Sequence, residues 1–302
     1  MLRSLLLYLS QQKRVQERLL RFSFTRKLAS RFVAGETLAD AVEVVRVQNQ
    51  RGMLATLDHL GEHVGSLEKA IAARDAYQEL LAEISRTQLR STISVKLTQL
   101  GLDFSEKECL ANLQSVVEYA EQTGNFVRVD MESSAYTTRT LGLIAEVRKT
   151  RRSVGAVIQA YLYRSESDLR EVLSQGTSVR LCKGAYNEPP SIAFPKKSDV
   201  DRNYVRLMKM LLSSGIYHGI ATHDPKLIEE TCRYAKEQGL SKEAFEFQML
   251  YGIRDDLQAR LVKEGYRLRI YIPYGQEWFS YFMRRLAERP ANVLFVVRNL
   301  LR

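Results

Sequence analysis

The stretch GIATHDP (Gly219–Pro225) contains the junction that decides the fold. GIATH is a short run of the kind that forms buried strands. Asp224 is a favoured N-cap residue, and Pro225 stands in the first helical turn, where proline is tolerated. Gly239 then follows the helical pattern as a C′ glycine. The stretch therefore predicts a strand that passes directly into a helix.

Similar short runs recur along the chain and alternate with longer helical patterns. Such alternation is typical of parallel strands joined by crossover helices, and about eight units fit a (β/α)8 barrel. A doubly wound sheet is the alternative, but the chain has neither GxGxxG nor GxxxxGK[ST], so the barrel is preferred. The predicted strands are Met53–Asp58, Thr92–Leu97, Phe126–Met131, Val154–Tyr161, Ser178–Lys183, Gly219–His223, Phe245–Leu250 and Leu268–Ile272.

We expect two parts in the chain: an N-terminal helical segment, 1–50, packed on or beside a catalytic barrel, 51–302. The stretch Arg3–Arg31 is basic with interleaved Leu and Phe, so an interfacial helix and a helix packed on the protein's own body both remain open. The run Leu5–Leu9 is too short for a secretory signal, and no apolar run reaches about 18 residues. We expect a cytoplasmic protein, with peripheral contact at the inner face of the cell membrane as an open alternative.

The composition restricts the function classes. The chain has 302 residues, of which 45% are hydrophobic and 26% charged, as in a globular protein with a sizeable core. Its net charge of +10 favours anionic partners such as nucleic acid, anionic lipid or phosphorylated cofactors, although charge that only aids solubility is equally compatible. Three scattered cysteines, four histidines and the absence of HxH and HExxH predict neither a disulfide framework nor a metal site.

Polar residues recur where the predicted strands end. In a (β/α)8 barrel, the active site lies at the carboxyl ends of the strands and in the loops that follow. Buried charges are costly unless they are paired or used, so polar groups at nearly every strand end predict a site, although each alone would suit a salt bridge. These residues are Lys96, Asp130, Gln159, Arg180, Lys183, Tyr186, Thr222, His223, Asp224, Gln248 and Tyr271.

These residues alone leave several functions open. Lys96 suits a Schiff-base barrel aldolase. A basic, non-enzymatic nucleic-acid binder would need clustered Lys and Arg with exposed aromatic residues. The positive charge is instead spread among the predicted helices, so we expect no nucleic-acid partner. The residues themselves therefore indicate a barrel enzyme with an anionic ligand.

Six blocks of sequence resemble the proline dehydrogenase family, in family order from Ser94 to Arg289. They are SVKLTQLGL (Ser94–Leu102), VRVDMESS (Val127–Ser134), VRLCKGAY (Val179–Tyr186), ATHD (Ala221–Asp224), FEFQMLYGI (Phe245–Ile253), and YIPYG with YFMRRLAER (Tyr271–Gly275, Tyr281–Arg289). The resemblance implies a distorted (β/α)8 TIM-type barrel with extra N-terminal helices, which binds FAD without a Rossmann fold. It further implies oxidation of L-proline to 1-pyrroline-5-carboxylate, with hydride transfer from proline C5 to flavin N5 and electrons passed to a membrane quinone.

The resemblance assigns substrate-binding residues. Arg284 and Arg285 match the paired arginines that bind the substrate carboxylate, and a guanidinium suits bidentate recognition of that group. Glu288 lies within helical reach of either arginine. The remaining positions are Lys96 and Asp130, beneath the proline ring and flavin, and Tyr186, Leu250 and Tyr271, around the ring. A hydroxyproline-oxidising relative remains an alternative, although Tyr271 would crowd a C4 hydroxyl.

The resemblance also assigns the cofactor contacts. Asp130 and Arg180 are the expected catalytic residues, with Arg180 near the N5 edge of the flavin, where its charge would stabilise the reduced ring. The segment Asn187–Ser198 falls where the family has a mobile loop. The expected FAD contacts are Met131, Gln159, Arg180, Lys183, Gly184, Ala185, Thr222 and His223.

Overall fold

The computed structural model describes residues 30–279 and 281–283. Strands and helices alternate along this part of the chain. The elements are α4 (Leu38–Gln50), β1 (Leu54–His59), α5 (Leu67–Arg86), β2 (Ser91–Val95), α6 (Glu106–Gln122), β3 (Val127–Val129), η1 (Ser134–Tyr136), α7 (Thr137–Arg148), β4 (Val154–Gln159), α8 (Ser165–Ser174), β5 (Val179–Cys182), α9 (Lys197–Leu212), β6 (His218–Ala221), α10 (Pro225–Glu237), β7 (Phe245–Leu250), α11 (Asp255–Lys263) and β8 (Leu268–Tyr274).

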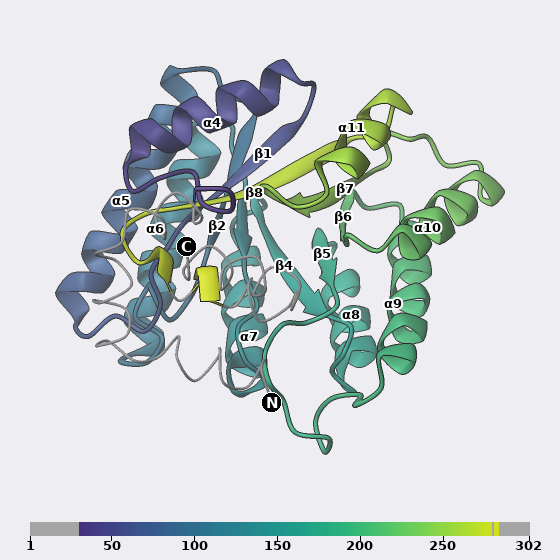
Figure 1. The fold of residues 1–302 in the computed structure, drawn as a ribbon. Helices are drawn as coiled ribbons and strands as arrows, with labels where there is room; N and C mark the ends of the chain where they lie inside the picture. Colours follow the sequence, from purple (N-terminus) through teal and green to yellow (C-terminus); the bar gives the residue numbers. More distant parts are fainter. Residues whose placement is uncertain (1–29, 280, 284–302) are drawn as a thin grey trace, which may run out of the picture.

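The eight strands form one closed parallel barrel in sequence order. β8 closes it by pairing with β1, from Leu54 opposite Arg269 to His59 opposite Tyr274. Figure 1 shows the helices around the outside of this barrel. The predicted TIM-type barrel is therefore confirmed, and each predicted run overlaps one of the eight strands.

The GIATHDP junction folds as its residues predict. The β6 strand ends at Ala221, and α10 starts at Pro225. The Asp224 carboxylate accepts a hydrogen bond from the Lys226 backbone N–H at 3.2 Å, which caps the helix. Gly239 follows the helix with a φ of +65°, a conformation that favours glycine. Thr222 and His223 thus lie just beyond the strand, at the edge of the barrel where α/β active sites form.

Helix α4 lies against the pair of strands that closes the barrel. It contacts β1 and β8, and its Ala41 and Val45 side chains belong to the same buried core as Ala55 and Leu57 of β1. Thr37 and Asp40 form a capping box at its start. Residues 1–29 lie outside the described part of the chain, so the division at residue 50 stays a prediction. No helix among the described residues is long and apolar enough to cross a membrane.

The hydrophobic core lies between the strands and the surrounding helices, whereas the barrel interior is polar. In β7, Phe245, Phe247 and Met249 belong to the core, and the alternating Glu246 and Gln248 are buried polar residues. Successive side chains of a strand point to opposite faces, so the polar set faces the barrel axis. Hydrogen bonds between strands that are not neighbours, such as β5 with β2, confirm this direction.

His218 at the start of β6 makes the fold sensitive to acid. Its ring is fully buried, accepts a hydrogen bond from the Val179 backbone N–H at Nδ1 (3.0 Å) and lies 2.9 Å from Ser214 Oγ at Nε2. Burial, helped by the positive charge of Arg128, lowers the pKa of His218 to about 3. The unfolded chain therefore takes up a proton below pH 6.5 that the folded protein does not, and stability is lost as the pH falls through this range.

We predict that His218→Gln lessens the acid sensitivity of the fold. Between pH 7 and pH 5 this histidine should account for a loss of about 2 kcal/mol in the free energy of unfolding, at about 1.4 kcal/mol per pH unit. Urea unfolding at both pH values measures it. An undiminished loss in His218→Gln would contradict the prediction.

Candidate active site

A network of alternating charges occupies the carboxyl ends of the strands. Asp130, immediately after β3, accepts hydrogen bonds from Arg180 Nη1 of β5 at 2.6 Å and from the Tyr271 hydroxyl of β8 at 2.7 Å. The Arg180 guanidinium also lies over the Tyr271 ring, 5.2 Å from its centroid. Lys96 Nζ, immediately after β2, is 3.7 Å from Asp130 Oδ2, the oxygen that also accepts the Tyr271 hydroxyl. Four strand ends that are distant in sequence therefore hold a compact, ion-paired cluster.

Asp58 of β1 completes this cluster and was not among the residues expected from the sequence. Its two carboxylate oxygens accept hydrogen bonds from Lys96 Nζ at 2.9 and 2.8 Å, and the residue is fully buried. The signal was present, because Asp58 is the last residue of the predicted run Met53–Asp58, and Asp130 likewise lies near the end of its own run. The rule that active-site groups lie at the carboxyl ends of barrel strands, applied to the first strand, would have identified Asp58 as well.

The charges of this cluster are stabilised by one another. Burial by itself lowers the pKa of Lys96, but the carboxylates of Asp58 and Asp130 outweigh it and raise that pKa above its usual value. Burial and the neighbouring carboxylates hold the pKa of Tyr271 well above its usual range. Lys96 is therefore an ammonium and Tyr271 a neutral hydrogen-bond donor at physiological pH.

Three different strands fix the orientation of the Arg180 guanidinium. Besides Asp130, it donates from Nη2 to Ser94 Oγ at 3.0 Å and from Nε to the side-chain oxygen of Gln248. Gln248 in turn donates to Glu246 Oε1 at 2.5 Å, and Arg269 holds the Glu246 carboxylate at 2.6 and 3.0 Å. A planar group held at all three nitrogens has one orientation available.

A cavity of about 560 Å³ opens above this cluster. This cavity is lined by every predicted site residue that falls within the described part of the chain. Such grouping is expected for residues at the carboxyl ends of barrel strands. They are Lys96, Asp130, Met131, Gln159, Arg180, Lys183, Gly184, Ala185, Tyr186, Thr222, His223, Leu250 and Tyr271. Arg284, Arg285 and Glu288 lie outside the described residues. The roles assigned to these residues stay predictions.

The far side of the cavity carries a second charged group. Lys183 Nζ contacts Asp201 at 2.5 Å and Asp224 at 3.0 Å, and Lys197 approaches Asp224 at 3.4 Å. His223 Nε2 accepts the Leu250 backbone N–H at 2.9 Å, so the neutral ring carries its proton on Nδ1. Two lysines and an imidazole N–H are suitable donors for a phosphate group.

Gly184, which follows β5 and lines the cavity, has a φ of +109° and lies close to the Tyr161 ring. An added Cβ would lie 2.2 Å from that ring, so no other residue fits without displacing it. Glycine at this position therefore lets the backbone after β5 pack directly against Tyr161, and this backbone forms part of the cavity wall.

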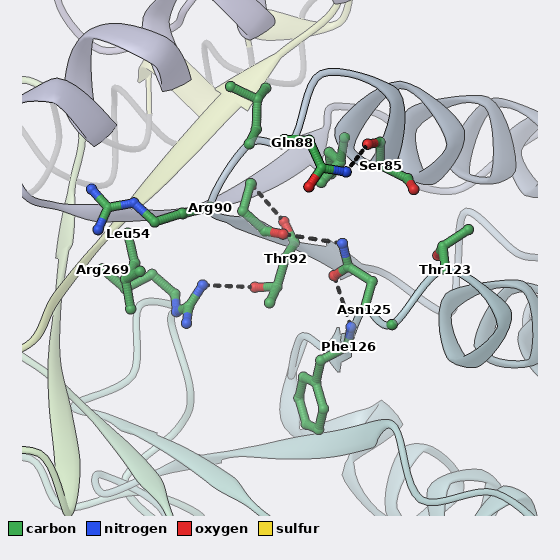
Figure 2. Close-up of a pocket in the computed structure, with 13 residues that line it drawn as sticks. Leu54, Ser85, Gln88, Arg90, Thr92, Thr123, Asn125, Phe126 and Arg269 are labelled. Carbon is green, nitrogen blue, oxygen red and sulfur yellow. Dashed lines mark hydrogen bonds between the residues drawn. The ribbon is translucent and has the colours of Figure 1, made fainter.

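Two other cavities lie elsewhere: one at the opposite end of the barrel, and one beside the active-site cavity. Figure 2 shows one of about 490 Å³ at the amino ends of the strands, where Asn125, Gln88 and Arg269 are bonded to the protein itself, Arg269 to Thr92 at 3.2 Å. Its polar groups serve the fold, as expected at this end of a barrel. The other, a groove of about 1230 Å³, adjoins the active-site cavity and shares Glu62, Ala185 and Tyr186 with it.

Among the described residues, no group of three or more His, Cys, Asp or Glu side chains is placed to hold a metal ion.

Comparisons with known proteins identify the family of this chain. A family model described as proline dehydrogenase matches residues 41–298. Proline dehydrogenase 1 of Bacillus subtilis is 42% identical over 302 residues, covering all of both chains, and proline dehydrogenase of Deinococcus radiodurans is 40% identical over 91% of this chain and 90% of its own. The solved structure of proline utilization A from Bdellovibrio bacteriovorus, inactivated by N-propargylglycine, superposes with a TM-score of 0.81 at 29% identity, over 87% of this chain and 32% of that one. The chain belongs to the proline dehydrogenase family.

Proposed function

We propose that the protein is an FAD-dependent enzyme that oxidises L-proline to 1-pyrroline-5-carboxylate. The observation that carries this is the cavity at the carboxyl ends of the strands, where Lys96, Asp130 and Arg180 form an ion-paired floor. Proline is a hydrocarbon ring with an acid and an amine, so it needs charged groups on one side and apolar surface on the other. Tyr186, Leu250 and Tyr271 supply that surface.

The residues present fit a flavin dinucleotide. Gly184 lines the cavity without a side chain, which suits contact with a flat ring system, and Lys183 and His223 suit the pyrophosphate. The fixed Arg180 guanidinium places a positive charge where the ring would lie, supporting its assignment beside the N5 edge. When bound, the flavin supplies the acceptor for the hydride that leaves proline C5. Met131, Gln159, Ala185 and Thr222 complete the proposed contacts.

Loss of hydride from C5 requires the proline nitrogen to be a neutral amine. Lys96 remains an ammonium because its carboxylate partners raise its pKa, so its charge would lower the pKa of a substrate ammonium beside it. The same raised pKa disfavours a Schiff-base aldolase, since an amine nucleophile must be deprotonated. The buried ion pair therefore supports an electrostatic role for Lys96 and opposes a covalent one.

The paired arginines complete the substrate assignment from the sequence. Arg284 and Arg285 bind the substrate carboxylate, and Glu288 holds a guanidinium in place between turnovers. Electrons then pass to a membrane quinone, with the enzyme cytoplasmic and in peripheral contact with the inner face of the cell membrane. The excess of basic residues in the chain supports contact with an anionic surface.

The visible spectrum of the purified protein tests the reaction. We expect absorbance of bound flavin at about 450 nm, bleached by L-proline without oxygen. D-proline, which carries its carboxylate on the opposite face, provides the control and should bleach it far more slowly. A colourless folded protein that takes up no added FAD, or one trapped on Lys96 by borohydride with a carbonyl substrate, would overturn the proposal.

We predict that Arg284→Ala and Arg285→Ala each weaken proline binding. Loss of a charge-assisted contact costs about 1.5–3 kcal/mol, or roughly a ten- to hundredfold higher KM. Steady-state kinetics with proline measure the change. Arg233→Ala removes an exposed arginine that pairs only with helix neighbours and should leave KM unchanged. Unaltered KM values in both variants would refute the carboxylate assignment.

We predict that Tyr271 sets the preference for proline over 4-hydroxyproline. Tyr271→Ala should open space at C4 and raise the ratio of kcat/KM for hydroxyproline to that for proline by about tenfold, equivalent to about 1.4 kcal/mol. Tyr271→Phe keeps the ring and loses the hydroxyl contacts with Asp130 and Lys96, so it separates crowding by the ring from the role of the hydroxyl. An unchanged ratio in Tyr271→Ala would show that this side chain does not set the selectivity.

A further inference from the structure

Asp58 has no role in the proposed function, yet it is the partner nearest to Lys96. It lies in β1 with no exposed surface, and each of its carboxylate oxygens is within 2.9 Å of the ammonium nitrogen. One side of the Lys96 ammonium is therefore occupied by Asp58. Its remaining donor capacity can reach the Tyr271 hydroxyl at 3.5 Å or the cavity that Lys96 lines.

The other charged groups around Lys96 are poor substitutes for Asp58. Asp130 on β3 is 3.7 Å away and already receives Arg180 and Tyr271. Glu62, in the loop after β1, acts on Lys96 electrostatically, and His59 lies beside Asp58 in the chain. Removing Asp58 would leave a buried ammonium without its nearest counter-charge. Such a group loses its proton or moves towards water.

We propose that Asp58 is the positioning residue for Lys96: it holds the ammonium at one point of the cavity floor and keeps it charged when the substrate binds. This inference rests on the proposed function in so far as it makes L-proline the ligand that Lys96 faces. Asp58 does not touch the substrate and acts only through Lys96. The two oxygens on one ammonium fix the position of the charge, and the burial of Asp58 fixes the carboxylate.

Amine labelling tests the state of Lys96 without relying on catalysis. The protein is treated briefly with acetic anhydride at several pH values between 7 and 10, and acetylation of Lys96 is measured by mass spectrometry. The wild-type lysine should resist labelling throughout. Asp58→Asn should increase its labelling at pH 9 by at least about tenfold, which corresponds to a fall of one unit in its pKa. Asp58→Glu retains the charge and should restore protection.

Asp168 provides a matched control for the substitution. It is a buried aspartate paired with Arg164 on α8, away from Lys96, so Asp168→Asn should leave the labelling of Lys96 as in the wild type. If Asp58→Asn does not fold, the acetylation of Lys96 in the wild-type protein still tests the proposal. Acetylation of wild-type Lys96 as fast as that of the exposed Lys149 throughout this pH range would overturn the proposal.

The pH dependence of catalysis gives the second readout. In Asp58→Asn, kcat/KM for proline should fall at a lower pH than in the wild type, because Lys96 loses its charge sooner, and Asp58→Glu should return the fall towards the wild-type pH. Superimposable profiles for Asp58→Asn and wild type would contradict the assignment. Failure of the proposed function is distinguishable, because the wild-type flavin would then not be bleached by proline, whereas the labelling of Lys96 requires no proline oxidation.

Discussion

The balance of buried charge inside the barrel is the constraint on which the rest of the structure depends. Asp58, Lys96, Asp130 and Arg180 alternate in sign at the carboxyl ends of the strands, and Glu246 with Arg269 continues the alternation towards the opposite end. Each charge is tolerable only because its neighbour compensates its loss of hydration. The interior of this barrel thus contains fixed charges in place of the apolar side chains that usually fill it, and these charges can bind a charged substrate.

Much of this arrangement is predictable from residue patterns. The alternation in LRIYI (Leu268–Ile272) and FEFQML (Phe245–Leu250) separates an apolar face from a polar one. Because strand side chains alternate in direction, this pattern already indicates strands with helices on one side and a polar interior on the other. The strand-end rule then places the candidate site, and the resemblance to the proline dehydrogenase family supplies the proposed roles of its residues.

Other features depend on distances that no local pattern contains. The pairing of Asp58 with Lys96 joins β1 to the end of β2, and a residue pattern cannot show which of several carboxylates lies nearest to a given cation. Strand ends were also imprecise: Phe126–Met131 was expected to be a strand, but only Val127–Val129 is, since Asp130 turns to its partners beyond β3. The contribution of Arg284, Arg285 and Glu288 still rests on resemblance alone.

The period-two arrangement of β7 restricts how this protein can change in length. If one residue were lost from that strand, every following side chain would exchange faces, so that Phe247 would enter the ionic interior and a polar neighbour would meet the helices. The deletion would destabilise the fold in two ways: an arginine inside the barrel would lose its partner, and a polar side chain would be buried in the apolar layer beneath the helices. Insertions and deletions among related chains should therefore be confined to the loops, while strand lengths remain constant.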